Sequence, residues 1–108
     1  MKETFGEYIH RLRTESELTL TKLAAALDID QSTLSKIENG KRNIPSEIIP
    51  KLSEFFNLDL NTLETEYLSE KIAEIIYSKD DIKTILQAAG EKAIYFKSKN
   101  VEQSKLKF

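Results

Sequence analysis

The sequence predicts an all-α fold, and three observations point to it. Only three of the 108 residues are glycine and two are proline, so residues that break helices are rare. Leu, Ile, Glu and Lys are abundant, which also favours helices. Apolar side chains recur every three or four positions, which is the period of an amphipathic helix.

The first two predicted helices are short. Four apolar side chains at helical spacing place the first over about residues 3–15: Phe5, Tyr8, Ile9 and Leu12. Either Thr19 or Thr21 can cap the second helix, because a hydroxyl oxygen there accepts a hydrogen bond from an unpaired backbone amide. The sequence Asp28-Ile29-Asp30 then interrupts this helix.

A third short helix is predicted after Asp30, whose carboxylate suits an N-cap. It carries Leu34 and Ile37 one turn apart. Asn39-Gly40 ends it, because both residues tolerate the left-handed conformation that a helix end requires. Residues 41–44 are predicted to form a loop.

The next predicted helix contains a proline. Inside a helix, Pro50 would remove a backbone hydrogen bond. We therefore predict a tight turn over residues 46–49, with Pro50 as the first residue of a helix that runs to Phe56. Asn57 is expected to end this helix.

Two long helices complete the prediction. Asp59 caps the first, over about residues 60–77, and the second covers about residues 81–97. The Lys-rich tail, residues 98–108, is expected to fray. The predicted parts of the chain are residues 1–65, a helical extension over residues 66–97, and this tail.

The composition excludes several kinds of chemistry. Without any Cys, the chain has no disulfide, thiolate nucleophile or Cys-bound zinc. The single histidine, His10, excludes a metal site built on several imidazoles, and we expect it at the surface without a chemical role. No nucleophile–base pair or metal cluster stands out, so we expect neither an enzyme nor a cofactor.

We expect a cytoplasmic protein that does not associate with membranes. The N-terminus carries acids where a signal peptide has an apolar core, and no apolar run approaches about 18 residues. The length leaves no room for a sensor domain, so no small-molecule effector is expected.

The most informative stretch is residues 19–42, TLTKLAAALDIDQSTLSKIENGKR. Two short helices meet there, and five apolar side chains bury one side of the pair: Leu23, Leu27, Ile29, Leu34 and Ile37. The second helix leaves short polar side chains and one cation outside, with no acid among them: Gln31, Ser32, Thr33, Ser35 and Lys36. Such a surface can enter a major groove and hydrogen-bond base edges.

The charge near this stretch is locally basic, although the chain has a net charge of −2. Residues 31–46 contain Lys36, Lys41 and Arg42 against Glu38 alone, an excess of +2. The acids of the first helix are expected to point away from any bound nucleic acid.

Residues 5–65 resemble the helix-turn-helix of the Cro/phage-repressor type, the XRE family. The most specific features are Leu23-Ala24, their spacing to Leu34 and Ile37, and the sequence IENGK at residues 37–41. The resemblance implies a five-helix domain, here with one additional C-terminal helix. It also implies a regulator that binds specific sequences of double-stranded DNA.

The resemblance assigns roles to individual residues. It implies base contacts from three residues of the predicted third helix: Gln31, Ser32 and Lys36. It implies contacts to the DNA backbone from residues around them: Thr19, Thr21, Thr33, Ser35, Asn39, Lys41 and Arg42. Arg13 and Glu38 match a family pair that bridges the first helix to the end of the third, and Arg offers a planar fork to a carboxylate.

The sequence departs from the family pattern at three positions. Leu20 stands where the family often has Gln, so one contact to a phosphate is expected to be missing. Asp28 replaces the usual turn Gly, and Glu17 stands where a Gly often ends the first helix. We expect the carboxylate of Asp30 to be occupied in capping, and DNA binding to be salt-sensitive.

A homodimer is expected, because one helix-turn-helix reads only a few base pairs and a two-fold dimer on a near-palindrome reads more. The two long helices carry more apolar surface than a five-helix unit requires. Candidate interface residues are Ile72, Ile75, Ile76, Ile82, Ile85, Leu86 and Phe96. The alternative is a hairpin of these helices on their own monomer.

Three functions remain open from sequence. A short chain of this family resembles the controller proteins of restriction–modification systems, which we favour. An antitoxin-type autorepressor that also binds a toxin is similar in size. A protein-interaction module without DNA binding is supported by Leu20 and the acidic balance, and opposed by the polar face of residues 31–36 and the Lys41-Arg42 loop.

Overall fold

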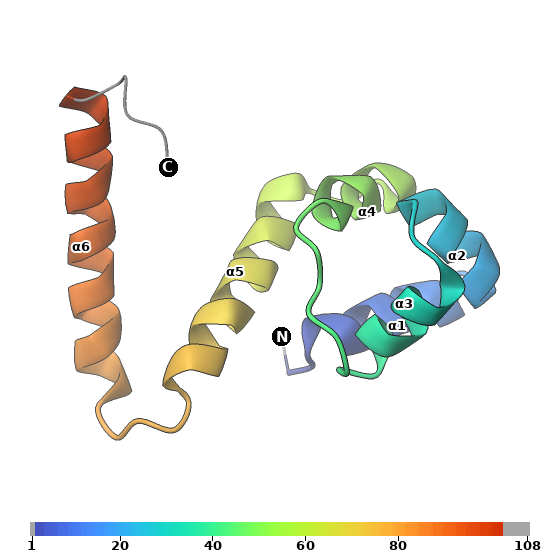
Figure 1. Cartoon of the computed structure of the whole chain (residues 1–108), viewed down its shortest axis with the longest axis horizontal. Coiled ribbons are helices and arrows are strands. Elements are labelled where there is room, and N and C mark those ends of the chain that lie inside the picture. The colour runs from blue at the N-terminus through green and yellow to red at the C-terminus, as the bar shows by residue number, and fades with distance from the viewer. Residues whose placement is uncertain (1, 103–108) are drawn as a thin grey trace. The chain divides into compact units, whose positions relative to one another are not determined.

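The computed structural model describes residues 2–102, which contain six helices and no strand (Figure 1). The helices are α1 Phe5–Glu15, α2 Leu20–Leu27, α3 Gln31–Glu38, α4 Ile48–Phe56, α5 Leu60–Ile76 and α6 Ile82–Glu102. The predicted all-α fold of five helices and one more is therefore confirmed. The chain forms two compact units that divide between Ile72 and Ala73, inside α5.

Polar side chains begin the first three helices. Thr4 forms a capping box with Glu7 at the start of α1, because each side chain accepts a hydrogen bond from the other residue's backbone amide. Thr19, and not Thr21, caps α2. The Asp30 carboxylate accepts a hydrogen bond from the Thr33 amide, at 2.7 Å, and begins α3.

Left-handed residues end three of the short segments without the help of glycine. Glu17, Asp28 and Asn57 all have φ between 55° and 59°. Asp28 ends α2 in this conformation, so the Asp that replaces the usual turn Gly adopts the glycine-like geometry. At the end of α3 only Gly40 is left-handed, with φ 73°, whereas Asn39 is not.

The start of α4 differs from the prediction. The helix begins at Ile48 rather than at Pro50, which is its third residue. The first amides of a helix have no acceptor within it, so the missing N–H of a proline costs nothing there. Ahead of it, the amides of Ile48 and Ile49 donate to carbonyls three residues back, as in a turn.

The core of the first unit is built by α1 to α4 and the start of α5. Nine of its large side chains are less than 2% exposed: Phe5, Ile9, Leu23, Leu27, Leu34, Ile37, Ile48, Leu52 and Leu63. In α3, Leu34 and Ile37 fill this core, and α3 packs against both α1 and α2. The opposite side of α3 is thereby left at the surface.

Gly6 allows α1 to approach the end of α3 very closely. It is buried, and a Cβ atom built on it would collide with the backbone carbonyl oxygen of Ile37. Since that oxygen belongs to the backbone, a rotamer change cannot relieve the collision. The small residue therefore sets the distance between α1 and α3.

Gly6→Ala is expected to lower the free energy of unfolding by about 1–3 kcal/mol, the usual cost of overpacking a core. Urea denaturation followed by circular dichroism measures it. The matched control is Gly90→Ala in α6, where nothing lies within 4 Å of the added Cβ. Because that glycine is helical, the control should be neutral or slightly stabilising. A Gly6→Ala variant as stable as the wild type would contradict the close approach.

The second unit contains α6, which is longer than predicted. It continues to Glu102, so residues 98–102 are helical rather than frayed. No Gly or Pro follows Phe96 to stop the helix, and its hydrogen bonds continue. Residues 103–108 of the predicted tail lie outside the described residues.

α5 exposes four large apolar side chains, and these are Leu60, Leu68, Ile72 and Ile75. Ile76, which is also a predicted interface residue, is 8% exposed, and its place in an interface stays a prediction. Ile76 is the last residue of the helix, and its carbonyl accepts a hydrogen bond from Lys79 in the turn that follows. Within residues 2–102, every helix is too short or too polar to span a lipid bilayer.

Candidate nucleic-acid interface

The exposed face of α3 carries the residues predicted to read bases. Gln31, Ser32 and Lys36 are exposed, and Ser35 beside them is half-buried. At about 100° per residue these four positions share one side of the helix. Thr33 is half-buried on another side, and its backbone amide is bound to Asp30.

The loop after α3 adds two exposed cations to this face. Gly40 turns the chain, and the amide of Lys41 donates to the carbonyl of Lys36, at 2.8 Å. Lys41 and Arg42 follow directly and are both exposed. Among the ion pairs of the described residues, none involves Lys36, Lys41 or Arg42. These cations are therefore available to a polyanion.

The acids close to this face are already engaged. Hydrogen bonds from the backbone and side chain of Thr33 hold the pKa of Asp30 below its ordinary value, so it stays ionised as a cap. The expectation that Asp30 is occupied in capping is confirmed. Asp28 lies 3.7 Å from the ammonium of Lys51 in α4.

Several residues predicted to contact the DNA backbone have partners within the chain. The hydroxyl of Thr21 donates to Oε1 of Gln31, at 2.8 Å, so the starts of α2 and α3 are joined. Thr19 is occupied as the cap of α2. The side-chain amide of Asn39 donates to the carbonyl of Ser35, at 2.9 Å, and closes the last turn of α3.

Arg13 of α1 forms an ion pair with Glu38 at the end of α3. Its Nε donates to Oε2 of Glu38 at 2.7 Å, and a terminal nitrogen donates to Oε1 at 3.0 Å. The remaining terminal nitrogen donates to the carbonyl of Leu18, at 2.9 Å. The side chains are 13% and 4% exposed, so this bidentate pair is largely buried. It fixes α3 against the scaffold.

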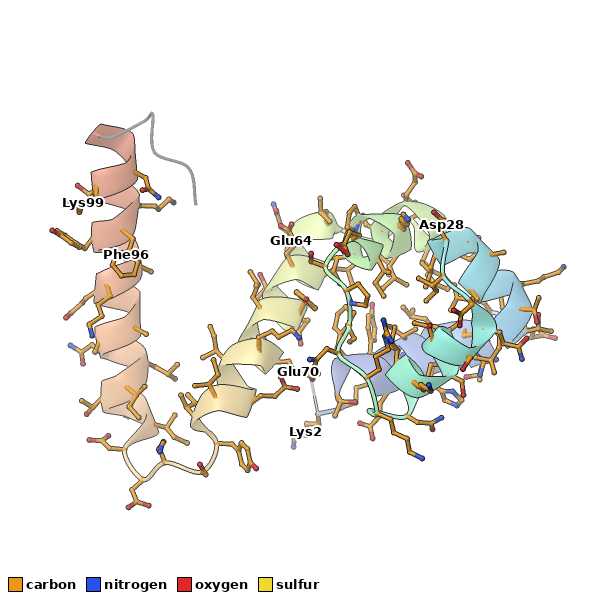
Figure 2. The ribbon with its side chains drawn as sticks, viewed as in Figure 1. Lys2, Asp28, Glu64, Glu70, Phe96 and Lys99 are labelled. Atoms are coloured by element: carbon orange, nitrogen blue, oxygen red, sulfur yellow. The ribbon has the colours of Figure 1, made fainter. Side chains whose placement is uncertain are left out.

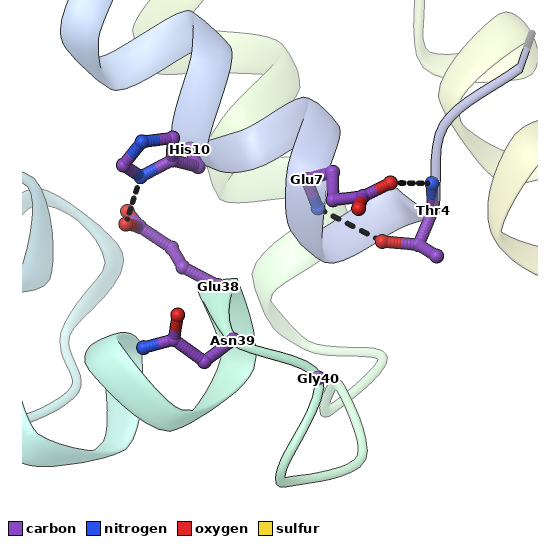
Figure 3. Close-up of a pocket in the computed structure, with 6 residues that line it drawn as sticks. All are labelled: Thr4, Glu7, His10, Glu38, Asn39 and Gly40. Atoms are coloured by element: carbon purple, nitrogen blue, oxygen red, sulfur yellow. Dashed lines mark hydrogen bonds and ion pairs between the residues drawn. The ribbon is translucent and has the colours of Figure 1, made fainter.

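His10, for which the sequence predicts no chemical role, joins this pair. Its Nδ1 lies 2.8 Å from Oε1 of Glu38, at the edge of a pocket of about 360 Å³ between α1 and the end of α3 (Figure 3). Burial raises the pKa of Glu38, but hydrogen bonds from Arg13 and His10 outweigh it, so this pKa lies below its ordinary value of 4.5. The sequence signal for this contact was that His10 and Arg13 are three residues apart and therefore lie on one face of α1.

Two further contacts from α5 support the interface and were also missed. The hydroxyl of Tyr67 donates to the carbonyl of Ile44 in the α3–α4 loop, at 2.8 Å. The carboxylate of Glu70 accepts a hydrogen bond from the backbone amide of Phe5 at the start of α1, at 2.8 Å. Glu70 is labelled on α5 in Figure 2. These partners are 23 and 65 residues apart, so no local pattern predicts them.

Comparison with known protein families agrees with this geometry. The family model described as helix-turn-helix matches residues 9–63, about half of the chain. The chain belongs to this family. The matched residues of this helix-turn-helix protein include α2, α3 and the whole cationic loop, and the type is that of the XRE regulators, as the sequence resemblance implied.

Three curated relatives are similar to this helix-turn-helix protein. The HTH-type transcriptional repressor RghR of Bacillus subtilis is 43% identical over 53 residues, 48% of this chain and 39% of RghR. Control protein C.MunI of a Mycoplasma species is 34% identical over 71 residues, 65% of this chain and 96% of the control protein. The ImmF control region 10 kDa protein of Bacillus phage phi105 is 36% identical over 59 residues, 55% of this chain and 66% of the phage protein.

The extent of these matches differs. The chain spans only about two fifths of RghR but nearly all of the control protein. About a third of this helix-turn-helix protein has no counterpart in the control protein. No solved structure gives a significant match to it.

Proposed function

We propose that this chain is a transcriptional regulator that binds double-stranded DNA in a sequence-specific manner, as a homodimer on a near-palindromic operator. One observation carries the proposal: α3 exposes Gln31, Ser32 and Lys36 on one face, beside a loop whose cations Lys41 and Arg42 form no ion pair in the described structure. No acid lies between Gln31 and Lys36, which suits this face to a polyanion.

In the proposed complex α3 lies in the major groove. An amide such as that of Gln31 can donate to and accept from base edges, and Lys36 can donate to the acceptors of guanine. Lys41 and Arg42 neutralise phosphates on the groove wall, which fixes the register of the helix but carries no sequence information. The pair of Arg13 and Glu38 keeps the orientation of α3 constant while it binds.

Selection from a pool of random duplexes tests the proposal. Repeated binding and sequencing should enrich a near-palindrome whose half-sites are about 10 base pairs apart, or a multiple of that. The affinity for the selected duplex should fall linearly with salt on a logarithmic scale, because bound counterions are released. If no sequence is enriched at low salt, the proposed function is wrong.

The exposed seam of α6 supports the dimer. Five side chains recur at alternating spacings of four and three residues, and all are exposed: Ile82, Leu86, Ala89, Ala93 and Phe96. This is the spacing by which one helix packs along another. Figure 2 shows side chains standing out along α6, with Phe96 labelled among them.

One chain alone cannot cover this seam. It extends from Ile82 to Phe96, about 21 Å along the helix, whereas the exposed stripe of α5, Leu68 to Ile75, extends about 10 Å. Before Leu68, the same side of α5 is polar, with Asn61 and Thr65. Folding α6 back on its own α5 would therefore leave half of the seam in water, and a second copy supplies what is missing.

The charges of the two helices fit such an arrangement. α5 carries Glu64, Glu66, Glu70 and Glu74 against Lys71, a net charge of −3. α6 carries Lys83, Lys92, Lys97 and Lys99 against Glu91 and Glu102, a net charge of +2. Two α6 helices alone would repel each other, so we propose that the acidic helix of one copy contributes to covering the basic helix of the other.

Leu86→Lys is expected to convert the dimer into a monomer, because it places a charge in the middle of the seam. Sedimentation velocity at tens of micromolar measures this. The matched control is Ile94→Lys, which is 71% exposed and lies about a third of a turn away from the seam. The control should remain dimeric. A wild type that sediments only as a monomer would overturn the dimer.

The match to the control protein over almost its whole length supports the controller type of regulator over the antitoxin type. The genes beside this one provide the test. A neighbouring methyltransferase or endonuclease gene is expected, whereas a toxin gene would contradict the controller type.

A further inference from the structure

The loop between α3 and α4 presents the two cations Lys41 and Arg42, and its shape is determined at two points. At its start, the left-handed Gly40 and the hydrogen bond from Lys41 to Lys36 direct the chain away from α3. Further on, Ile44 is buried in the core, 9% exposed. Between Arg42 and this buried residue lies only Asn43.

The second point is held by Tyr67 of α5. Its hydroxyl donates to the carbonyl oxygen of Ile44, at 2.8 Å. The ring is itself well placed, since its centroid is 6.0 Å from that of Phe5, in an edge-on arrangement. On the outside, the ammonium of Lys71 lies 5.3 Å from the centre of the ring. The hydroxyl is therefore a fixed donor and not a mobile surface group.

We propose that Tyr67 is a positioning residue for DNA binding, because its hydroxyl sets the path of the loop that carries Lys41 and Arg42 to the phosphates. This inference rests on the proposed function. Two residues of extended chain span about 7 Å, so a displacement of Ile44 moves Arg42 with it. Tyr67 touches no DNA and acts only through the loop.

The physical reason is the carbonyl of Ile44. A backbone acceptor on a buried residue that loses its donor must find another, and water is the alternative. Water then competes for this partly buried carbonyl, and the backbone around Ile44 is no longer held in its present path. The cations two and three residues earlier would then lose the geometry that suits the phosphates.

Tyr67→Phe tests the inference, because it removes one oxygen atom and keeps the ring. In the free protein we expect the amide resonances of residues 42–45 to shift and their hydrogen exchange to accelerate. Affinity for the selected duplex should fall about five- to tenfold, and the slope of log affinity against log salt should shrink by about one. The amide resonances of the other helices should stay unchanged.

The matched control is Tyr8→Phe. Tyr8 is also half-buried with its ring beside that of Phe5, at 5.8 Å, and its hydroxyl has no hydrogen-bond partner among the described residues. It should leave the loop resonances, the affinity and the salt slope unchanged. A loss of stability alone would lower the unfolding midpoint without changing the salt slope, and would overturn the positioning role.

The outcomes separate this inference from the proposed function. If the wild type binds the duplex and Tyr67→Phe keeps its affinity and salt slope, only the positioning role is wrong. If the wild type binds no duplex, the proposed function fails and the positioning role fails with it.

Discussion

Glu38→Ala is expected to lower the free energy of unfolding by about 3–5 kcal/mol, the cost of leaving one partner of a buried ion pair unpaired. Arg13 is 13% exposed, and its fork makes two hydrogen bonds to Glu38. Without the carboxylate, the charged guanidinium of Arg13 remains largely buried and has no counter-ion. Small domains are stable by about 5–15 kcal/mol, so the variant should lose a large share of its stability and unfold at a clearly lower urea concentration.

Urea denaturation measures this effect, and the chain offers a control. Glu15 is 63% exposed and pairs with Arg11 across one helical turn, at 3.5 Å. Glu15→Ala should change the free energy of unfolding by less than about 0.5 kcal/mol, since exposed pairs contribute little. Replacing Arg13 by Met and Glu38 by Leu together should cost less than the two single changes added. Equal costs for Glu38→Ala and Glu15→Ala would contradict the role of the buried pair.

The pH dependence of stability provides a second readout of the same pair. Burial raises the pKa of Glu38, and the hydrogen bonds from Arg13 and His10 lower it further than burial raises it, to below 4.5. A carboxyl whose pKa is lowered by folding stabilises the protein above its unfolded pKa, and that stability is lost as the pH falls through the folded value. The wild type should therefore lose stability below about pH 4.5, and Glu38→Gln should lose less over the same range.

The double variant Lys36→Ala, Arg42→Ala is expected to weaken DNA binding by about 100-fold or more at moderate salt. Lys36 is expected to contact bases from α3, and Arg42 a phosphate from the loop. Both are exposed and in no ion pair of the described structure, and their only noted electrostatic partner is the exposed carboxylate of Asp30, so their removal should cost the fold little. The slope of log affinity against log salt should shrink by about one or two, which fluorescence anisotropy at several salt concentrations measures.

The control for this variant removes two cations elsewhere in the same unit. Arg11 of α1 pairs with Glu3 and Lys51 of α4 lies beside Asp28, so neither cation belongs to α3 or to the loop that follows it. Arg11→Ala, Lys51→Ala changes the net charge equally and should keep most of the affinity. If both double variants lose the same affinity, binding depends on net charge and not on this face. If the first variant binds as the wild type does, the chain is better explained as a protein-interaction module.

Much of the local structure could be predicted from the sequence, because its causes lie within a few residues of each other. Thr19, Asp30 and Asp59 begin helices by accepting hydrogen bonds from amides three residues ahead. The exposed face of α3 follows from the spacing of Leu34 and Ile37, which must be buried. The start of α4 was predicted two residues too late, because proline is tolerated at any position in the first turn of a helix and not only at the first residue.

The candidate site was predicted only in part. Gln31, Ser32 and Lys36 are at the surface as expected, and their contacts to bases remain a prediction. The pair of Arg13 and Glu38 was inferred from the family resemblance and is formed in the structure. His10 was assigned no role, because a lone histidine on a polar helix face gives no sign of the carboxylate that α3 brings to it.

The sequence by itself determined most helix starts, which sides of the helices are apolar, and which short polar stretch between two helices stays at the surface. Only the tertiary structure decided that Gly6 must be small, that Glu70 holds the first amide of α1, and that Tyr67 holds the loop of the two cations. The physical reason is the distance along the sequence over which each kind of interaction acts. Capping and helical periodicity act over three or four residues, whereas the contacts of Tyr67 and Glu70 join residues 23 and 65 positions apart, which meet only after the core has packed.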